Sequence, residues 1–316
     1  MAVLQRITRS PAGRWGRAVA VLLGLLVSAS AVAQSADRPA YRLFTSAGKP
    51  VAYGKMTKAL AGADVVLFGE EHNNAIAHWL ELQVARDLLR VKGDKLVLGA
   101  EMFERDVQPV LAAYVGVCDS ITEKDLTEKA RPWPNYATDY RPLVELARAN
   151  RLRFIGTNIP RPYAREVSQK GLDATINAVV ERTADQEQLL PPLPLRVDMQ
   201  RPAYQKMRAM FGSDEAHGGA GGGIDRMIAA QALKDATMAH FIATGRAPGE
   251  LLLHVNGSFH SDDHSGICEY LLAEAPGTKL LTISTVSQDD LRKLAPENRG
   301  KADYILVVPT DMTKTY

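Results

Sequence analysis

The stretch that decides the fold is Asp64-Val65-Val66-Leu67-Phe68-Gly69-Glu70-Glu71-His72, a short apolar run that ends in Gly-x-x-His. A second stretch repeats this pattern downstream, Leu251-Leu252-Leu253-His254-Val255-Asn256-Gly257-Ser258-Phe259-His260. Both runs have the length and composition of buried strands. A Gly after a strand permits a sharp turn, and a His three residues later can point over the carboxyl edge of the sheet. Open α/β sheets place their binding sites at that edge.

The segments around these two runs alternate between strand and helix patterns. We predict further strands at residues 96–100, 152–156, 279–284 and 304–308. Helices are predicted at residues 75–91, 139–149, 224–244 and 264–273. This alternation predicts an α/β fold with a mostly parallel sheet and helices on both faces. Residues 172–211 read as largely helical, so we expect one α/β domain over 34–316 with a helical insertion at about 166–245.

Residues 1–33 have the composition of a signal peptide. An apolar core at 18–27 is too short to span a membrane, and Ala31-Val32-Ala33 is a small-residue cleavage pattern. A basic leader precedes the core, with Arg6, Arg9, Arg14 and Arg17. We therefore expect cleavage after Ala33 and a periplasmic protein. No Cys lies near the cleavage point, so no lipid attachment is expected.

Charge and cysteine content narrow the function classes. The chain has 38 Lys and Arg against 36 Asp and Glu, a net charge of +2. Removing the leader, which holds four Arg and no acid, gives 34 − 36 = −2, so nucleic acid is not an implied partner. The two cysteines, Cys118 and Cys268, can either pair or remain free. Because the chain lacks Cys-x-x-Cys-His, covalent c-type haem attachment is excluded.

Polar residues follow the predicted parallel strands and are expected to meet at one edge of the sheet. Two imidazoles and a carboxylate, from His72, His260 and Glu101, suit a divalent metal. With Glu70, the same residues suit general acid–base catalysis. The alternative is that each is a capping or hydrogen-bonded polar side chain, which we favour for Asn158 and Asn256. His78 does not share a helical face with His72, so we interpret it as a surface or packing residue.

The predicted helical insertion contains a second group of candidate residues. Tyr204, Met207, Met210 and Phe211 are spaced as one helical stripe, which is typical of a packed core and also suits the cover of a porphyrin. A phenolate or imidazole can ligate haem iron, so Tyr204 and the nearby His217 are candidate ligands. Arg161 and Arg165 lie four residues apart and either meet haem propionates or form a solvated face.

Five ordered motifs resemble those of ChaN-type haem-binding uptake proteins, which belong to a wider superfamily with Tiki and TraB proteins and erythromycin esterases. The motifs are Gly69-Glu70-Glu71-His72, Leu98-Gly99-Ala100-Glu101-Met102-Phe103, Trp133-Pro134-Asn135-Tyr136 with Tyr140-Arg141-Pro142-Leu143, Gly156-Thr157-Asn158-Ile159-Pro160-Arg161, and Asn256-Gly257-Ser258-Phe259-His260. The family's helical motif Gln-x-x-Trp-Asp-x-x-Met-Ala starts here at Gln231, with Lys234 in place of the Trp.

The resemblance implies a periplasmic protein that binds haem non-covalently, works with a haem-uptake machinery, and forms a homodimer that sandwiches haem. The implied haem-binding residues are Tyr204, Met207, His217 and Arg161. The family's ligating tyrosine can also correspond to Tyr136, Tyr140 or Tyr163. The rival hypothesis is a divalent-metal-dependent hydrolase, with Glu70, His72, Glu101 and His260 as catalytic residues and His72, Glu101 and His260 as metal ligands.

Overall fold

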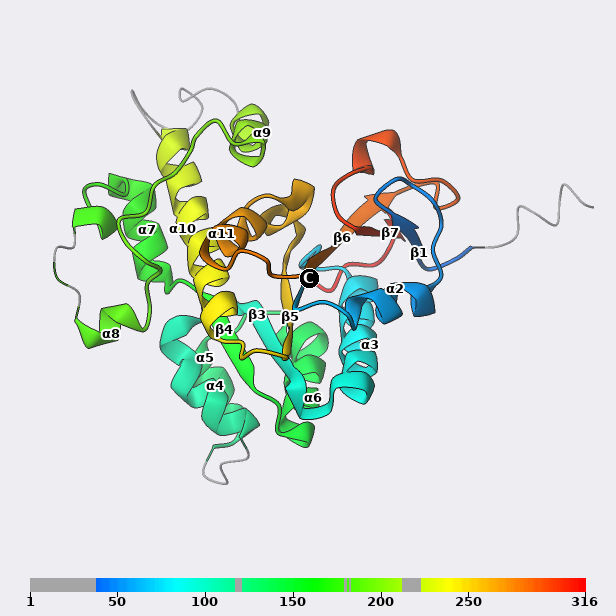
Figure 1. The fold of residues 1–316 in the computed structure, drawn as a ribbon, viewed down its shortest axis with the longest axis horizontal. Helices are drawn as coiled ribbons and strands as arrows, with labels where there is room; N and C mark the ends of the chain where they lie inside the picture. The colour runs from blue at the N-terminus through cyan, green and yellow to red at the C-terminus, as the bar shows by residue number, and fades with distance from the viewer. Residues whose placement is uncertain (1–37, 117–120, 179–180, 182, 212–222) are drawn as a thin grey trace, which may run out of the picture. The chain divides into compact units, whose positions relative to one another are not determined.

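A seven-stranded sheet organises residues 41–316 of the chain in a computed structural model (Figure 1). The strand order is β1-β7-β6-β2-β5-β3-β4, and every pairing is parallel except that of β1 with β7. The strands are β1 (Arg42–Thr45), β2 (Val65–Glu70), β3 (Leu96–Glu104), β4 (Phe154–Asn158), β5 (Leu251–Gly257), β6 (Leu280–Gln288) and β7 (Tyr304–Pro309).

The structure describes residues 38–116, 121–178, 181, 183–211 and 223–316. The predicted signal peptide, Cys118 and His217 lie outside these ranges. Contacts group Tyr41–Tyr316 into one unit and Met1–Ala40 into another. Among the described helices, none combines the length and the apolar composition needed to cross a membrane.

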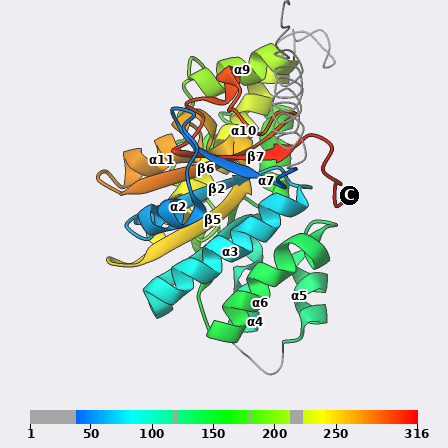
Figure 2. The same ribbon diagram turned by 90° about the vertical axis from the view of Figure 1, so that its right-hand side faces the viewer.

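Helices cover both faces of the sheet because both faces of its central strands are apolar. Along β2, Val66 and Phe68 pack with one cluster of helices, whereas Val65 and Leu67 pack with another. Figure 2 shows α3 and α6 on one side of the sheet and α10 on the other. The helices are α2 (Tyr53–Leu60), α3 (Ala75–Lys92), α4 (Gln108–Val115), α5 (Glu123–Ala130), α6 (Arg141–Asn150), α7 (Arg161–Lys170), α8 (Ala184–Glu187), α9 (Pro202–Phe211), α10 (Gly223–Thr244) and α11 (Ile267–Glu274).

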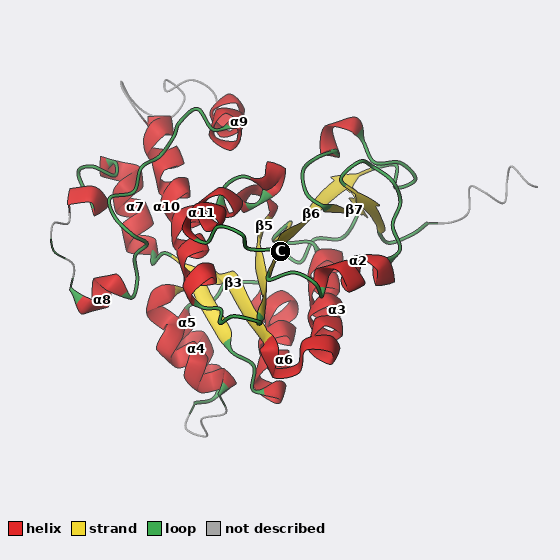
Figure 3. Cartoon of the chain, viewed as in Figure 1, coloured by secondary structure: helices red, strands yellow, loops and turns green. Residues whose placement is uncertain are grey.

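The predicted α/β class and mostly parallel sheet are confirmed. Each predicted strand is present, although β3 continues to Glu104, well beyond residue 100. The sequence patterns missed β1 and α2, which are only 4 and 8 residues long. Between β4 and β5 the described residues form helices and loops with no strand (Figure 3). That region is less helical than predicted, because α8 spans 4 residues and irregular chain follows it.

Candidate functional site at the carboxyl edge of the sheet

Three neighbouring strands bring the two Gly-x-x-His segments together. β2 pairs with β5 up to Glu70 and Gly257, and β5 pairs with β3 up to Val255 and Ala100. The carboxyl ends of parallel strands share one edge of a sheet. Glu70, Glu101 and the residues just after β2 and β5 therefore lie side by side. The predicted convergence of His72, Glu101 and His260 at this edge is observed in the structure.

The two Gly-x-x-His glycines are required by close packing and not by an unusual backbone conformation. Neither Gly69 nor Gly257 has a positive φ, so the turns that follow β2 and β5 do not depend on a backbone conformation that favours glycine. A Cβ on Gly69 would lie 2.9 Å from the Ser258 backbone, and a Cβ on Gly257 would lie 2.7 Å from the His72 ring. The absent side chains let one Gly-x-x-His segment pack directly against the other.

His260 is buried and held between two carboxylates. Its Nδ1 lies 2.5 Å from Asp235 Oδ1, and its Nε2 lies 3.2 Å from Glu101 Oε1. Burial opposes protonation, but the charges of Glu101 and Asp235 outweigh it and raise the pKa of His260 to about 10. Burial also acts on Glu101, yet His260 and the backbone N–H of Gly257 hold the pKa of that carboxyl well below its usual range. The pair is therefore an imidazolium beside a carboxylate at pH 7.

His72 is the accessible member of the site, with 41% of its side chain exposed. Its Nδ1 lies 2.7 Å from Glu70 Oε1, and its ring meets Trp133 edge-on at 4.6 Å between centroids. Burial lowers the pKa of His72, whereas the hydrogen bond to Glu70 and the charge of Glu101 raise it. The two raising effects together are larger, so the net shift of the pKa is upward. His72 can therefore meet a solute while the other polar residues of the edge stay buried.

Sequence reasoning missed four residues that support this edge. Asp235 and Gln231, one helical turn apart on α10, both contact His260. Asn135 donates to the His72 carbonyl at 2.7 Å, and the hydroxyl of Tyr140 donates to Glu70 Oε1. The available signal was an Asp within the apolar helix at 224–244, since a carboxylate there needs a buried partner. Asn256 has the structural role favoured for it, because it hydrogen-bonds Gly257, Ser261 and His254.

A third buried histidine lies behind this edge. His78, predicted to be a surface or packing residue, is only 5% exposed. Its Nδ1 lies 3.1 Å from Glu81 Oε2 and 3.5 Å from Glu70 Oε2. Burial raises the pKa of Glu81 to about 8. Among the described residues, Glu70, His78 and Glu81 are the one group of three metal-binding side chains whose ligand atoms lie within 4.8 Å of one another.

The structure separates the residues predicted to bind haem. Tyr204 and Met207 face inward and pack with Ile224, Ile228 and Ala232, whereas Met210 on the same helix is 64% exposed. The Tyr204 hydroxyl lies 3.4 Å from that of Tyr270, and burial raises its pKa far above the usual range. The Arg161 side chain is engaged by Glu104, with Nε 2.5 Å from Oε1. His217 lies outside the described residues.

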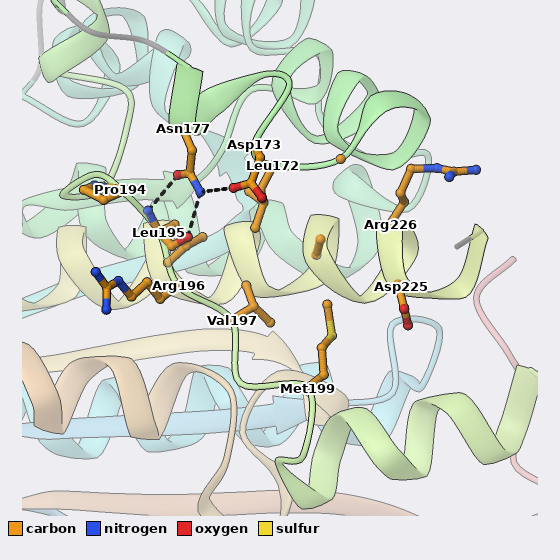
Figure 4. A pocket seen from close by; sticks show the side chains of 12 residues that line it. Leu172, Asp173, Asn177, Pro194, Leu195, Arg196, Val197, Met199, Asp225 and Arg226 are labelled. Carbon is orange, nitrogen blue, oxygen red and sulfur yellow. Dashed lines mark hydrogen bonds between the residues drawn. The ribbon is translucent and has the colours of Figure 1, made fainter. Parts of the chain in front are cut away.

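A cavity of about 710 Å³ opens between α10, the segment at 171–177 that follows α7, and the segment at 194–199 (Figure 4). Its apolar lining includes Leu172, Leu195, Val197 and Met199, and its polar lining includes Arg196. Among the described residues that line it, none is a His, Tyr or Cys, and none belongs to the strand-edge site. This cavity and the polar cluster at the strand edge are therefore different places, and the cavity has the size of an organic ligand site.

Comparison with known proteins gives one family and several similar folds. The model of the family described as haem-binding uptake, Tiki superfamily, ChaN matches residues 56–271. A structure of ChaN from Campylobacter jejuni, described with cofacial haem binding, is similar at 16% identity and a TM-score of 0.63. The match covers 85% of this chain and 96% of that one. A search of curated proteins finds no significant match.

Two further solved structures are more distant. The type III effector HopBA1 matches at 12% identity and a TM-score of 0.42, over 80% of this chain and 91% of that one. A protein from Bacillus cereus matches at 13% identity and a TM-score of 0.45, over 81% of this chain and 90% of that one.

Proposed function

Because the chain belongs to the haem-binding uptake family of ChaN in the Tiki superfamily, we propose that it binds haem non-covalently in the periplasm and passes it to a haem-uptake machinery. The family match over residues 56–271 is the observation that carries this proposal, since it spans β2 to β5 and the helical region between β4 and β5. The chain's own contribution is the cavity of about 710 Å³ beside α10, which falls within the usual range for ligand sites.

The residues of the cavity fit haem in part. Apolar side chains from Leu172, Leu195 and Val197 suit the faces of a porphyrin, and the guanidinium of Arg196 suits a propionate. The thioether of Met199 is the one lining side chain of a type that ligates haem iron. Tyr204 fits less well, because its buried phenol resists the deprotonation that ligation requires.

A second subunit would complete such a site. The Campylobacter jejuni structure is described with cofacially bound haem, an arrangement in which two haems face each other. We infer that this chain likewise binds haem as a homodimer, with the haems enclosed between two copies. Enclosure between two subunits would remove the porphyrin from water.

Haemin titration tests the proposal. We expect a saturable Soret band with one haem per chain, and Val197→Trp, which fills the cavity, should weaken binding at least tenfold. Ala112→Trp, which fills a smaller cavity of about 430 Å³ beside α4, is the matched control and should leave binding unchanged. Absence of a saturable Soret band would refute haem binding. Equal loss in both variants would refute the placement. An unchanged Soret band in Tyr204→Phe would show that the Tyr204 phenol does not ligate the haem iron.

The strand-edge site supports a second candidate function, a hydrolase. The supporting observation is the contact chain Asp235–His260–Glu101 beside the accessible His72, because a protonated imidazole and a partly exposed one are suited to acid and base roles. His260 Nδ1 faces Asp235 and Nε2 faces Glu101, so the metal site predicted at His72, Glu101 and His260 stays a prediction. Hydrolysis of a panel of esters and peptides that is lost in Glu101→Gln, with haem binding retained, would support this function.

A further inference from the structure

The buried group around His78 has features that the hydrogen-bond network does not account for. Glu70, His78 and Glu81 are 2%, 5% and 2% exposed. Within this group, Glu70 Oε2 and Glu81 Oε1 are both buried and accept no hydrogen bond. A buried carboxylate oxygen without a partner is costly. Glu70 Oε2 lies 3.5 Å from His78 Nδ1, so this unpartnered oxygen faces the imidazole and indicates that a positively charged ligand belongs beside it.

The imidazole is oriented as a metal ligand. His78 Nε2 lies 3.1 Å from the backbone carbonyl of His72, which fixes Nε2–H as the donor to that carbonyl. Asp139 Oδ2, 3.6 Å from Nε2, adds to this orientation. A histidine that binds a metal through one nitrogen commonly donates its other N–H to a carbonyl or a carboxylate. Nδ1 is then left to face the two carboxylates.

Contacts within the protein also orient the two carboxylates. The Tyr140 hydroxyl donates to Glu70 Oε1, so the other oxygen of Glu70 faces His78. Glu81 lies one turn beyond His78 on α3 and presents Oε2 to the same nitrogen at 3.1 Å. The three ligand atoms lie within 4.8 Å of one another, which is a span that one ion can bridge. Glu70 Oε1 also contacts His72, whose side chain is 41% exposed.

We propose that Glu70, His78 and Glu81 form a binding site for one divalent first-row transition cation, separate from the cavity beside α10 and from the contacts of His260 with Asp235 and Glu101. One imidazole and two carboxylates suit Zn²⁺, Fe²⁺ or Mn²⁺ better than Ca²⁺ or Mg²⁺, because the nitrogen favours transition metals. The cation neutralises the buried carboxylates and links the start of α3 to the end of β2. This site is independent of the proposed haem binding.

Zinc binding by the purified full-length mature protein tests the site. The protein is stripped with EDTA and dialysed against ZnCl₂ at pH 7.5, and the bound metal is counted by mass spectrometry. We expect one Zn²⁺ per chain, with at least tenfold weaker binding in Glu81→Gln and in His78→Gln. His240→Gln is the matched control, because His240 and Glu274 form another His–Glu pair at 2.7 Å. That variant and His260→Asn should bind Zn²⁺ as the wild type does.

X-ray absorption of the zinc-loaded wild type provides a second readout that needs no variant. The proposed site gives one imidazole nitrogen and oxygen ligands, whereas a site at His72 and His260 gives two imidazoles. A wild type that retains no Zn²⁺, a two-imidazole spectrum, or zinc binding that is lost in His260→Asn and kept in Glu81→Gln would each overturn the proposal. Haem binding measured on the same samples is a separate result, so failure of one proposal does not decide the other.

Discussion

Gly69 is a glycine because of its neighbours and not because of its backbone angles. A Cβ at this position would lie 2.9 Å from the Ser258 backbone and 3.0 Å from the Ile283 carbonyl oxygen. Both atoms belong to the backbone and not to a flexible side chain, so a Cβ at position 69 would force backbone segments to shift. We expect Gly69→Ala to destabilise the fold by about 1–3 kcal/mol, the usual range for overpacking, as measured by urea unfolding.

The matched control for Gly69→Ala is Gly54→Ala in α2. A Cβ on Gly54 would meet nothing within 4 Å, and alanine is the better helix former by about 1 kcal/mol. This control should leave stability unchanged or raise it. A Gly69→Ala protein as stable as the wild type would show that β2 and the Ser258 segment are further apart than described.

His254 makes stability depend on pH. It is fully buried in β5, where Nδ1 donates to Asn256 Oδ1 and Thr157 Oγ1 lies 2.7 Å from Nε2. Burial lowers its pKa to about 4, whereas in the unfolded chain it is about 6.5. Between these values the unfolded state binds the proton and the folded state does not. Above pH 6.5, His254 therefore does not reduce the free energy of unfolding. That free energy falls as the pH drops from 6.5 toward 4.

The free energy of unfolding is expected to be about 2 kcal/mol lower at pH 5 than at pH 7, because pH 5 lies about 1.5 units below the unfolded-state pKa of 6.5. Urea unfolding at pH 7 and pH 5 measures it. His254→Gln, which keeps polar atoms in the strand but cannot titrate, should lose about 2 kcal/mol less than the wild type over this interval. Identical pH dependence in the two proteins would contradict the assignment.

At the scale of elements, α3 depends on its N-cap residue. Asn74 accepts hydrogen bonds from the backbone N–H groups of Ile76 and Ala77 and donates to Glu71. It is also fully buried. We expect Asn74→Ala to cost about 1–2 kcal/mol, at the upper end of the range for a helix N-cap. Chemical denaturation provides the measurement.

Thr122→Ala is the comparison for this cap. Thr122 caps α5 through Asp125, but the pair is exposed, so water can replace the lost hydrogen bond. The cost should be about 0.5 kcal/mol, below that of Asn74→Ala. Equal costs in the two variants would indicate that burial of Asn74 adds nothing to its cap.

At the scale of the whole molecule, export is a prediction that the described residues do not address. The leader's four Arg, its apolar core and Ala31-Val32-Ala33 predict cleavage after Ala33. Intact-mass measurement of protein taken from the periplasm should give a chain of 316 − 33 = 283 residues beginning at Gln34. A mass that corresponds to the uncleaved chain, or one increased by a lipid, would contradict the prediction.

The sequence by itself determined the α/β class and the edge at which the polar residues meet. The continuous apolar runs in β2 and β5 predict strands buried on both faces. A parallel sheet then places their carboxyl ends together. These are local properties: each depends on a few consecutive residues and on one topological rule, so His72, Glu101 and His260 could be grouped before their geometry was known.

Only the tertiary structure decided what surrounds those residues. Asp235 reaches His260 from 25 residues away, and Tyr140 reaches Glu70 from 70 residues away, so no local spacing predicts either contact. The same holds for His78, whose position six residues after His72 argues against a shared site on one helical face. The chain turns between β2 and α3, and that turn places the His78 ring against Glu70 and the His72 carbonyl. Long-range packing fixes such contacts, and it also decided that Met210 faces solvent while Tyr204 packs in the helical core that its spacing predicted.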